Sequence, residues 1–128
     1  MMDLLSERHP FYDPIAKIAS LADKGQLEMI VSALSYTTVN YLLTKIDGPE
    51  TIKDKLRKFR IISEVASLDD EIIEKALNSN FADFEDAVQY FSALKSNCKI
   101  IITRNARDFK ESGLPIMTAQ EFLIIRMK

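Results

Sequence analysis

"DFEDAVQYFSALKSNCKIIITRNARDF", the stretch from Asp83 to Phe109, has an apolar middle and acidic or polar ends. Apolar residues at helical spacing fill its first half, and the run "KIIIT" that follows is typical of a buried strand. Asp83 and Asp86 stand at the first end, and Asn105 and Asp108 stand at the second. A helix followed by a strand of this kind predicts an α/β crossover, so this stretch bears on both the fold and the site.

The same alternation of helical and strand-like patterns runs through the rest of the chain. Helices are expected at residues 12–25, 35–46, 49–59, 67–79 and 83–97, and strands at residues 27–32, 60–65, 99–103 and 115–118. A capping box of Thr118 and Glu121 predicts one more short helix at the end. Because long helical stretches separate the strands, we expect parallel pairing with helices on both faces. The predicted fold is a three-layer α/β/α sandwich with a parallel sheet of at least four strands.

Some details of these helices can be checked individually. Gly25 should stop the first helix. Ile46 should face inward at the end of the second, and Phe84 and Leu94 should pack inward on the helix at 83–97.

The composition favours one globular domain over residues 1–128. The chain has 128 residues, and 47% of them are hydrophobic, which is enough for a sizeable core. The net charge of −2 gives no global basic field for nucleic acid, so a polyanionic partner would have to be held locally. Cys98 is the single cysteine and cannot form an intrachain disulfide, and no apolar run is long enough to span a bilayer. We expect a cytoplasmic protein without a membrane anchor.

The two ends of the quoted stretch should meet in space. In a right-handed crossover the helix runs antiparallel to the strand, so the start of the helix returns beside the carboxyl end of "KIIIT". Open α/β proteins bind ligands at that edge. Carboxylates crowded there repel one another unless a cation lies among them, and magnesium takes one or two carboxylates together with waters and phosphate oxygens.

A purely structural interpretation of these acids stays open. Asp83 followed three residues later by Asp86 also fits an N-terminal cap, and acids in a first turn complement the helix dipole. Asp108 could equally form an Asx turn before Phe109. The convergence of two separate segments is what favours a metal site over these local roles.

The stretch from Asp83 to Phe109 resembles the signature half of a PIN domain, the metal-dependent nuclease fold that includes the VapC toxins of toxin–antitoxin pairs. Its acid pair opens a helix, and its strand ends in "T-R-N-x-x-D-F". "MDLLSERHPFYDPI" and "IVSALSYTTVNYLL" resemble earlier parts of the same fold, so the likeness covers nearly the whole chain.

The resemblance implies roles for particular residues. Asp86 would be the metal ligand at the start of the helix, with Asp83 as an auxiliary acid, and Asn105 and Asp108 would form the polar pair after the strand. Thr103 would help to position that pair. The implied cofactor is magnesium or manganese, the implied activity is RNA cleavage, and the implied partners are an antitoxin or a second copy in a homodimer.

Two departures from the family pattern weaken the expected catalysis. The family opens with a central strand ending in "D-x-N", whereas this chain begins at "MMDLLSERHP", apparently inside the first helix, so that aspartate has no counterpart. Asp3 cannot simply replace it. The family also often carries a glutamate on the third helix, where this chain offers only Asn40. We expect that a longer natural protein, a partner that adds a strand, or a closed-up sheet compensates for the missing strand.

Other functions remain as alternatives. One is a degenerate PIN fold that binds RNA or protein without catalysis. A phosphoacceptor receiver domain is disfavoured because no acid pair follows an early strand. Arg104 and Arg107 flank the expected site and could contact phosphate. The basic helix "KDKLRKFR" could hold an RNA backbone, although the solvated face of an amphipathic helix explains it better.

Overall fold

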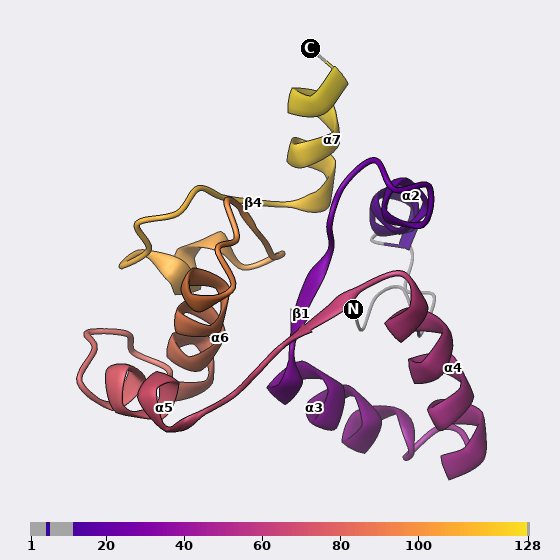
Figure 1. Cartoon of the computed structure of the whole chain (residues 1–128), viewed down its shortest axis with the longest axis horizontal. Coiled ribbons are helices and arrows are strands. Elements are labelled where there is room, and N and C mark those ends of the chain that lie inside the picture. Colours follow the sequence, from indigo (N-terminus) through magenta and orange to yellow (C-terminus); the bar gives the residue numbers. More distant parts are fainter. Residues whose placement is uncertain (1–4, 6–11, 128) are drawn as a thin grey trace. The chain divides into compact units, whose positions relative to one another are not determined.

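The computed structural model describes Leu5 and residues 12–127, and these belong to two compact units. The first unit comprises residues 1–65 and the second residues 66–128. Element labels follow Figure 1, in which the numbering of the helices starts at α2. Each unit is described by itself below, and the prediction of a single domain over residues 1–128 stays a prediction.

Three helices and a short sheet make up the described part of the first unit. The helices are α2 (Tyr12–Asp23), α3 (Ala33–Leu43) and α4 (Pro49–Ile61), and β1 (Ile30–Ser32) pairs with β2 (Glu64–Ala66). Val39 and Leu43 of α3 pack against Ile52 of α4 as a buried cluster. Burial of such side chains stabilises each by roughly 1.5 to 3 kcal/mol, which is enough to fix the pairing of these two helices.

The helix ends of the first unit follow local sequence signals. Ser32 Oγ accepts a hydrogen bond from the backbone N–H of Ser35 and so caps α3. Gly25 lies at a φ of 73° directly after α2, where its backbone N–H donates to the carbonyl of Ala22, so its predicted role as a helix stop is confirmed. Ile46, however, is 72% exposed, because α3 ends at Leu43 and the inward face no longer reaches it.

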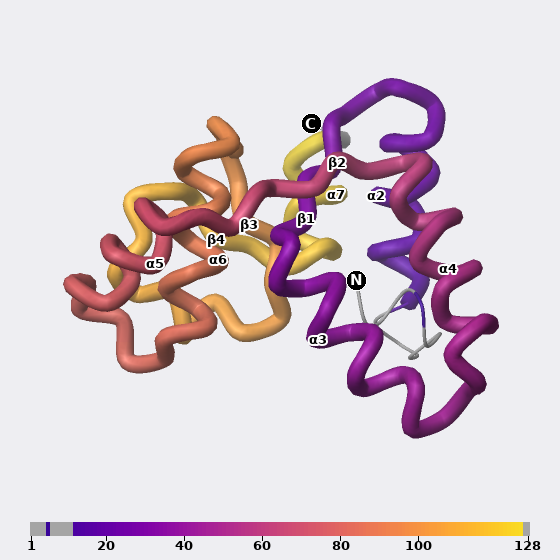
Figure 2. Tube along the Cα trace, turned by 60° about the horizontal axis from the view of Figure 1, so that its bottom comes forward, coloured from indigo at the N-terminus to yellow at the C-terminus, as the bar shows by residue number. Residues whose placement is uncertain are grey.

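The second unit contains a helix pair and a second short sheet. Helices α5 (Asp70–Leu77) and α6 (Phe84–Lys95) lie side by side, as Figures 1 and 2 both show. β3 (Ile101–Ile102) pairs in parallel with β4 (Ile116–Met117), and the 3₁₀ turn η1 (Ala106–Phe109) lies between them in sequence. The final helix is α7 (Ala119–Met127), and its predicted capping box is confirmed by reciprocal hydrogen bonds between Thr118 and Glu121.

Salt bridges join the start of α5 to the end of α6. Lys95 Nζ contacts the carboxylates of Asp69 and Glu71. Its hydrogen bond lowers the pKa of Asp69, and the pKa of Glu71 is lowered by Lys75 first and by Lys95 second. Ile72 of α5 and Val88 of α6 are buried in the same unit. The pair is therefore held by apolar packing, with charge pairing at its exposed edge.

The fold is α/β, but the predicted sheet of at least four strands is not formed within the described residues. The strands pair two by two, as β1 with β2 and β3 with β4. Each strand is two or three residues long and gains ladder hydrogen bonds from one neighbour only, which limits the width of the sheet. A membrane anchor was not expected, and on this point the structure shows only that no helix of the described residues is both long and apolar enough to cross a bilayer.

Candidate functional site

The acids at the start of α6 are organised by a helix cap. Asp83 is the N-cap residue, and its Oδ2 accepts a hydrogen bond from the backbone N–H of Asp86 at 3.1 Å. The capping interpretation of this pair is therefore correct for one oxygen of Asp83. Because a carboxylate has two oxygens, the cap leaves the second oxygen of Asp83 available for another interaction.

Asp86 lies in a crowded acidic environment. Partial burial, then the neighbouring charges of Asp83 and Asp108, raise the pKa of Asp86 to about 6. Hydrogen bonding between the Asp86 and Asp83 carboxyls raises it further. Helix α6 and the 3₁₀ turn η1, which carry these acids, contact each other in the second unit. That the acids share one pocket stays a prediction.

The turn that carries Asp108 is built by short-range hydrogen bonds. Thr103, directly after β3, accepts a hydrogen bond on Oγ1 from the backbone N–H of Asn105 at 3.1 Å. Asn105 in turn accepts a hydrogen bond on its carbonyl from the N–H of Asp108 at 3.0 Å. Thr103 therefore helps to position the Asn105–Asp108 turn, as the resemblance implies.

The two cationic side chains predicted to bind phosphate belong to the same segment. Arg104 follows β3, and Arg107 lies within η1; both are exposed. The basic residues of α4 are arranged differently, since Lys53, Lys55 and Arg57 pair with Glu50, Asp47 and Asp54 in turn. These pairs offset much of the positive charge of α4, which supports the solvated-face interpretation of that helix.

The predicted ligands fit a hydrated divalent cation in chemistry but do not form a ready-made cage. Within residues 12–127 and Leu5, no three side chains of His, Cys, Asp or Glu are grouped closely enough to hold one metal ion. Magnesium, however, is commonly bound by one or two carboxylates with waters filling the other positions. Asp86 and Asp108 offer hard oxygen donors, and a cation would relieve the repulsion that raises the pKa of Asp86. Their assignment as ligands, together with Asp83, stays a prediction.

Aromatic side chains that were not among the predicted site residues pack around the turn that carries Asp108. Phe81 contacts the rings of Tyr90, Phe91 and Phe109, and Phe109 itself is 5% exposed. Phe109 directly follows Asp108, so its burial anchors the turn. Phe84 and Leu94 were predicted to pack inward, but Phe84 is 47% exposed at the first position of α6 and Leu94 is 39% exposed in its last turn, where the packing of the helix ends.

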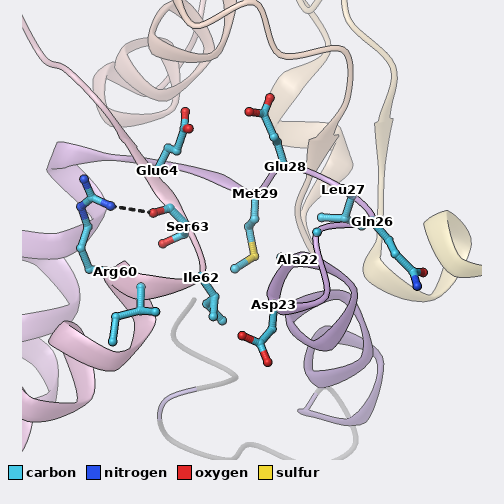
Figure 3. Close-up of a pocket in the computed structure, with 12 residues that line it drawn as sticks. Ala22, Asp23, Gln26, Leu27, Glu28, Met29, Arg60, Ile62, Ser63 and Glu64 are labelled. Atoms are coloured by element: carbon cyan, nitrogen blue, oxygen red, sulfur yellow. Dashed lines mark hydrogen bonds between the residues drawn. The ribbon is translucent and has the colours of Figure 1, made fainter.

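A separate hollow of about 520 Å³ lies in the first unit, near the ends of α2 and α4. Figure 3 shows Arg60, Ser63 and Met29 among its lining, and Arg60 donates a hydrogen bond to the Ser63 carbonyl. None of the predicted catalytic residues lines it. Asn40, considered as a neutral substitute for a family glutamate, lies on α3. Asp3, the other residue considered, falls outside the described residues.

Similarity to known proteins identifies the family of this chain. The chain is similar to Ribonuclease VapC1 of Aquifex aeolicus (strain VF5), with 28% identity over 127 residues that cover 95% of this chain and 87% of the relative. No solved structure matches the chain significantly. The family model described as PIN domain matches residues 1–107, which include Asp83, Asp86 and Asn105. Because this match covers most of the sequence, the chain belongs to the PIN domain family.

Proposed function

We propose that this protein is a divalent-metal-dependent ribonuclease and the toxin of a toxin–antitoxin pair. The observation that carries the proposal is the environment of Asp86 in a protein of the PIN family, where partial burial and then the charges of Asp83 and Asp108 raise the pKa of Asp86 to about 6. Carboxyl groups with shifted pKa values are concentrated at functional sites, because catalysis needs charged groups at positions where ionisation destabilises the fold. Similarity to a protein named Ribonuclease VapC1 supports RNA as the substrate.

In this proposal each residue has a defined task. Asp86 and Asp108 bind the cation, magnesium or manganese, and Asp83 adds negative charge behind Asp86 while it caps α6. Asn105 offers a neutral carbonyl oxygen, and Thr103 holds the turn in place. When bound, the ion activates a water molecule and polarises the phosphodiester group.

The cationic side chains of the same segment bind the substrate. Arg104 and Arg107 contact phosphate groups of the RNA, as guanidinium groups do in bidentate geometry. An antitoxin protein would restrain this activity in the cytoplasm, and a homodimer is the second association we propose.

The deciding experiment measures RNA cleavage by Asp86→Asn beside the unmodified protein. Loss of cleavage, together with loss of unmodified-protein activity in excess chelator and its return with magnesium or manganese, is the expected result. Glu85→Gln is the matched control, since it removes a neighbouring exposed carboxylate and should keep activity. Cleavage by Asp86→Asn at the unmodified rate, in preparations free of other nucleases, would refute the proposal.

A binding measurement separates this function from its alternative. Titration calorimetry with Mn²⁺ should show one site that Asp86→Asn removes and Glu85→Gln retains. If binding is no stronger than that of a generic acidic surface, the non-catalytic RNA- or protein-binding module becomes the better description.

A further inference from the structure

The turn that carries Asp108 is attached to α6 through one buried tyrosine. Tyr90 Oη accepts a hydrogen bond from the backbone N–H of Gly113 at 2.9 Å, across 23 positions in sequence. The Tyr90 ring also lies 5.1 Å from the ring of Phe81, centroid to centroid. Phe81 in turn contacts Phe109 at 6.1 Å. These contacts connect α6 to both ends of the Phe109–Gly113 segment.

The positions of these contacts relate them to the acids. Tyr90 follows Asp86 by four residues on α6, so the two side chains lie one turn apart on the same side of the helix. Phe109 is the residue next to Asp108. Each acid of the candidate pair is therefore adjacent to one member of the aromatic cluster formed by Phe81, Tyr90, Phe91 and Phe109.

We infer that Tyr90 is a positioning residue, whose hydroxyl group holds the Asn105–Asp108 turn opposite Asp86 by fixing Gly113. This inference rests on the proposed function, because the position of Asp108 matters for catalysis only if Asp108 binds the ion. Neither the name of the similar ribonuclease nor the family description assigns any role to this tyrosine.

Besides the burial of Phe109 and the local hydrogen bonds of Ser112, the segment has little regular structure. Its flanking strands are two residues long, and η1 is a four-residue 3₁₀ turn. Short elements with few ladder hydrogen bonds open locally at low free-energy cost. The hydrogen bond from the Gly113 N–H to this buried phenol adds to that cost, because opening of the segment breaks it.

Gly113 suits this role through its small size. A Cβ atom built at this position would lie 3.3 Å from Tyr90 Oη, which is closer than ordinary van der Waals contact. Gly113→Ala should therefore push the hydroxyl group away from the loop or lengthen the hydrogen bond. It provides a second variant that disturbs the same link while leaving the tyrosine unchanged.

The test compares two matched tyrosine variants of the full chain. Tyr90→Phe removes only the hydroxyl group at the anchor. Tyr36→Phe makes the same change in the first unit, where Tyr36 Oη shares a 3.2 Å hydrogen bond with Ser63 Oγ. Both lose one partly buried hydrogen bond, so a purely structural role predicts similar behaviour for the two variants.

Two readouts distinguish positioning from general stability. The amide N–H of Asp108 should exchange with solvent at least about fivefold faster in Tyr90→Phe, and at the unmodified rate in Tyr36→Phe. The Kd for Mn²⁺ should rise about tenfold in Tyr90→Phe, as is typical when a residue that orients a ligand is removed. RNA cleavage should show a lower kcat with little change in KM, and extra magnesium should partly restore it.

Each outcome decides the inference. Unchanged Asp108 exchange in Tyr90→Phe, or equal changes in both tyrosine variants, overturns it. If Tyr90→Phe does not fold, Gly113→Ala is used, and faster Asp108 exchange in that variant supports the inference while unchanged exchange overturns it. If the unmodified protein binds no Mn²⁺, the proposed function fails separately, and the exchange rates alone decide whether Tyr90 holds the turn.

Discussion

The carboxylate of Asp83 accepts a 3.1 Å hydrogen bond from the backbone N–H of Asp86, while its charge opposes ionisation of the Asp86 side chain. One residue thus stabilises the helix terminus and destabilises the ionised form of its neighbour. The cap explains why Asp83 is useful to the fold. Asp86, by contrast, costs stability when it ionises, and such conflicts are expected at functional sites.

Asp86 should make the metal-free protein less stable as pH rises. Its pKa of about 6 in the folded state exceeds the ordinary value of 3.8, so the folded state binds a proton more tightly than the unfolded state. The free energy of unfolding should therefore fall between about pH 4 and pH 6 as Asp86 ionises, and it should keep the lower value above that range. Urea denaturation from pH 4 to pH 7.5, in the presence of chelator, should follow this trend.

Asp86→Asn should remove this cost. Above pH 6 the variant should be more stable than the unmodified protein by about 1 kcal/mol, once solvent screening of a partly exposed carboxyl is allowed for. Glu85→Gln should change stability much less, because Glu85 is the smallest contributor to the shifted pKa. A destabilised Asp86→Asn at pH 7.5 would show that the carboxylate is not under electrostatic strain.

Neutralising the neighbours of Asp86 should lower its pKa in a fixed order. Asp83→Asn should have the larger effect and Asp108→Asn a smaller one, because Asp83 contributes more to the shift. Neither substitution should restore the ordinary value, since burial is the largest cause. Carbon-13 NMR titration of the Asp86 carboxyl measures this pKa in the unmodified protein, in Asp83→Asn and in Asp108→Asn. No change in Asp108→Asn would place Asp108 outside electrostatic range of Asp86.

Ser92→Ala should stabilise the second unit. Ser92 is 1% exposed on α6, and within the described part of the chain its Oγ is buried without a hydrogen-bond partner. Burial of an unpaired hydroxyl costs roughly 1 to 3 kcal/mol, so its removal should gain on the order of 1 kcal/mol. Chemical denaturation measures the gain. A loss of stability in Ser92→Ala would indicate that the hydroxyl has a partner in solution.

Asn97→Gly should also stabilise the protein, by roughly 0.5 to 1 kcal/mol. Asn97 has a φ of 60° just after α6, where Cys98 N–H donates to the Ala93 carbonyl in a Schellman-type end. Asn78→Gly is the contrasting variant, because Asn78 has a φ of −98° and its side chain bonds back to Glu74. Asn78→Gly should destabilise the protein. Urea denaturation measures both variants, and equal shifts in their denaturation midpoints would contradict the backbone argument.

Local features of the fold could be predicted from the sequence, and long-range features could not. The stop at Gly25 and the Thr118–Glu121 capping box depend on residues within one or two turns of each other. The strand pairing depends on partners far apart in sequence, so the sequence pattern did not show that the strands pair two by two. The sequence pattern likewise did not show that α3 ends at Leu43, which leaves Ile46 exposed.

The candidate site shows the same division. The acids were found from the sequence because crossover geometry brings the start of a helix to the end of the following strand. The link between Tyr90 and Gly113 spans 23 positions and leaves no periodic signal, so the sequence pattern did not single out Tyr90. A cluster of aromatic residues near both acids, formed by Phe81, Tyr90 and Phe109, was the one available hint.

Paramagnetic broadening by Mn²⁺ tests most directly whether Asp86 and Asp108 share a cation. In nitrogen-15 correlation spectra, the amide signals of both residues should disappear together at substoichiometric Mn²⁺, before those of the acidic α5 residues Asp70 and Glu71. Broadening that begins at α5, or that reaches only one of the two aspartates, would contradict a shared ion and with it the proposed nuclease site.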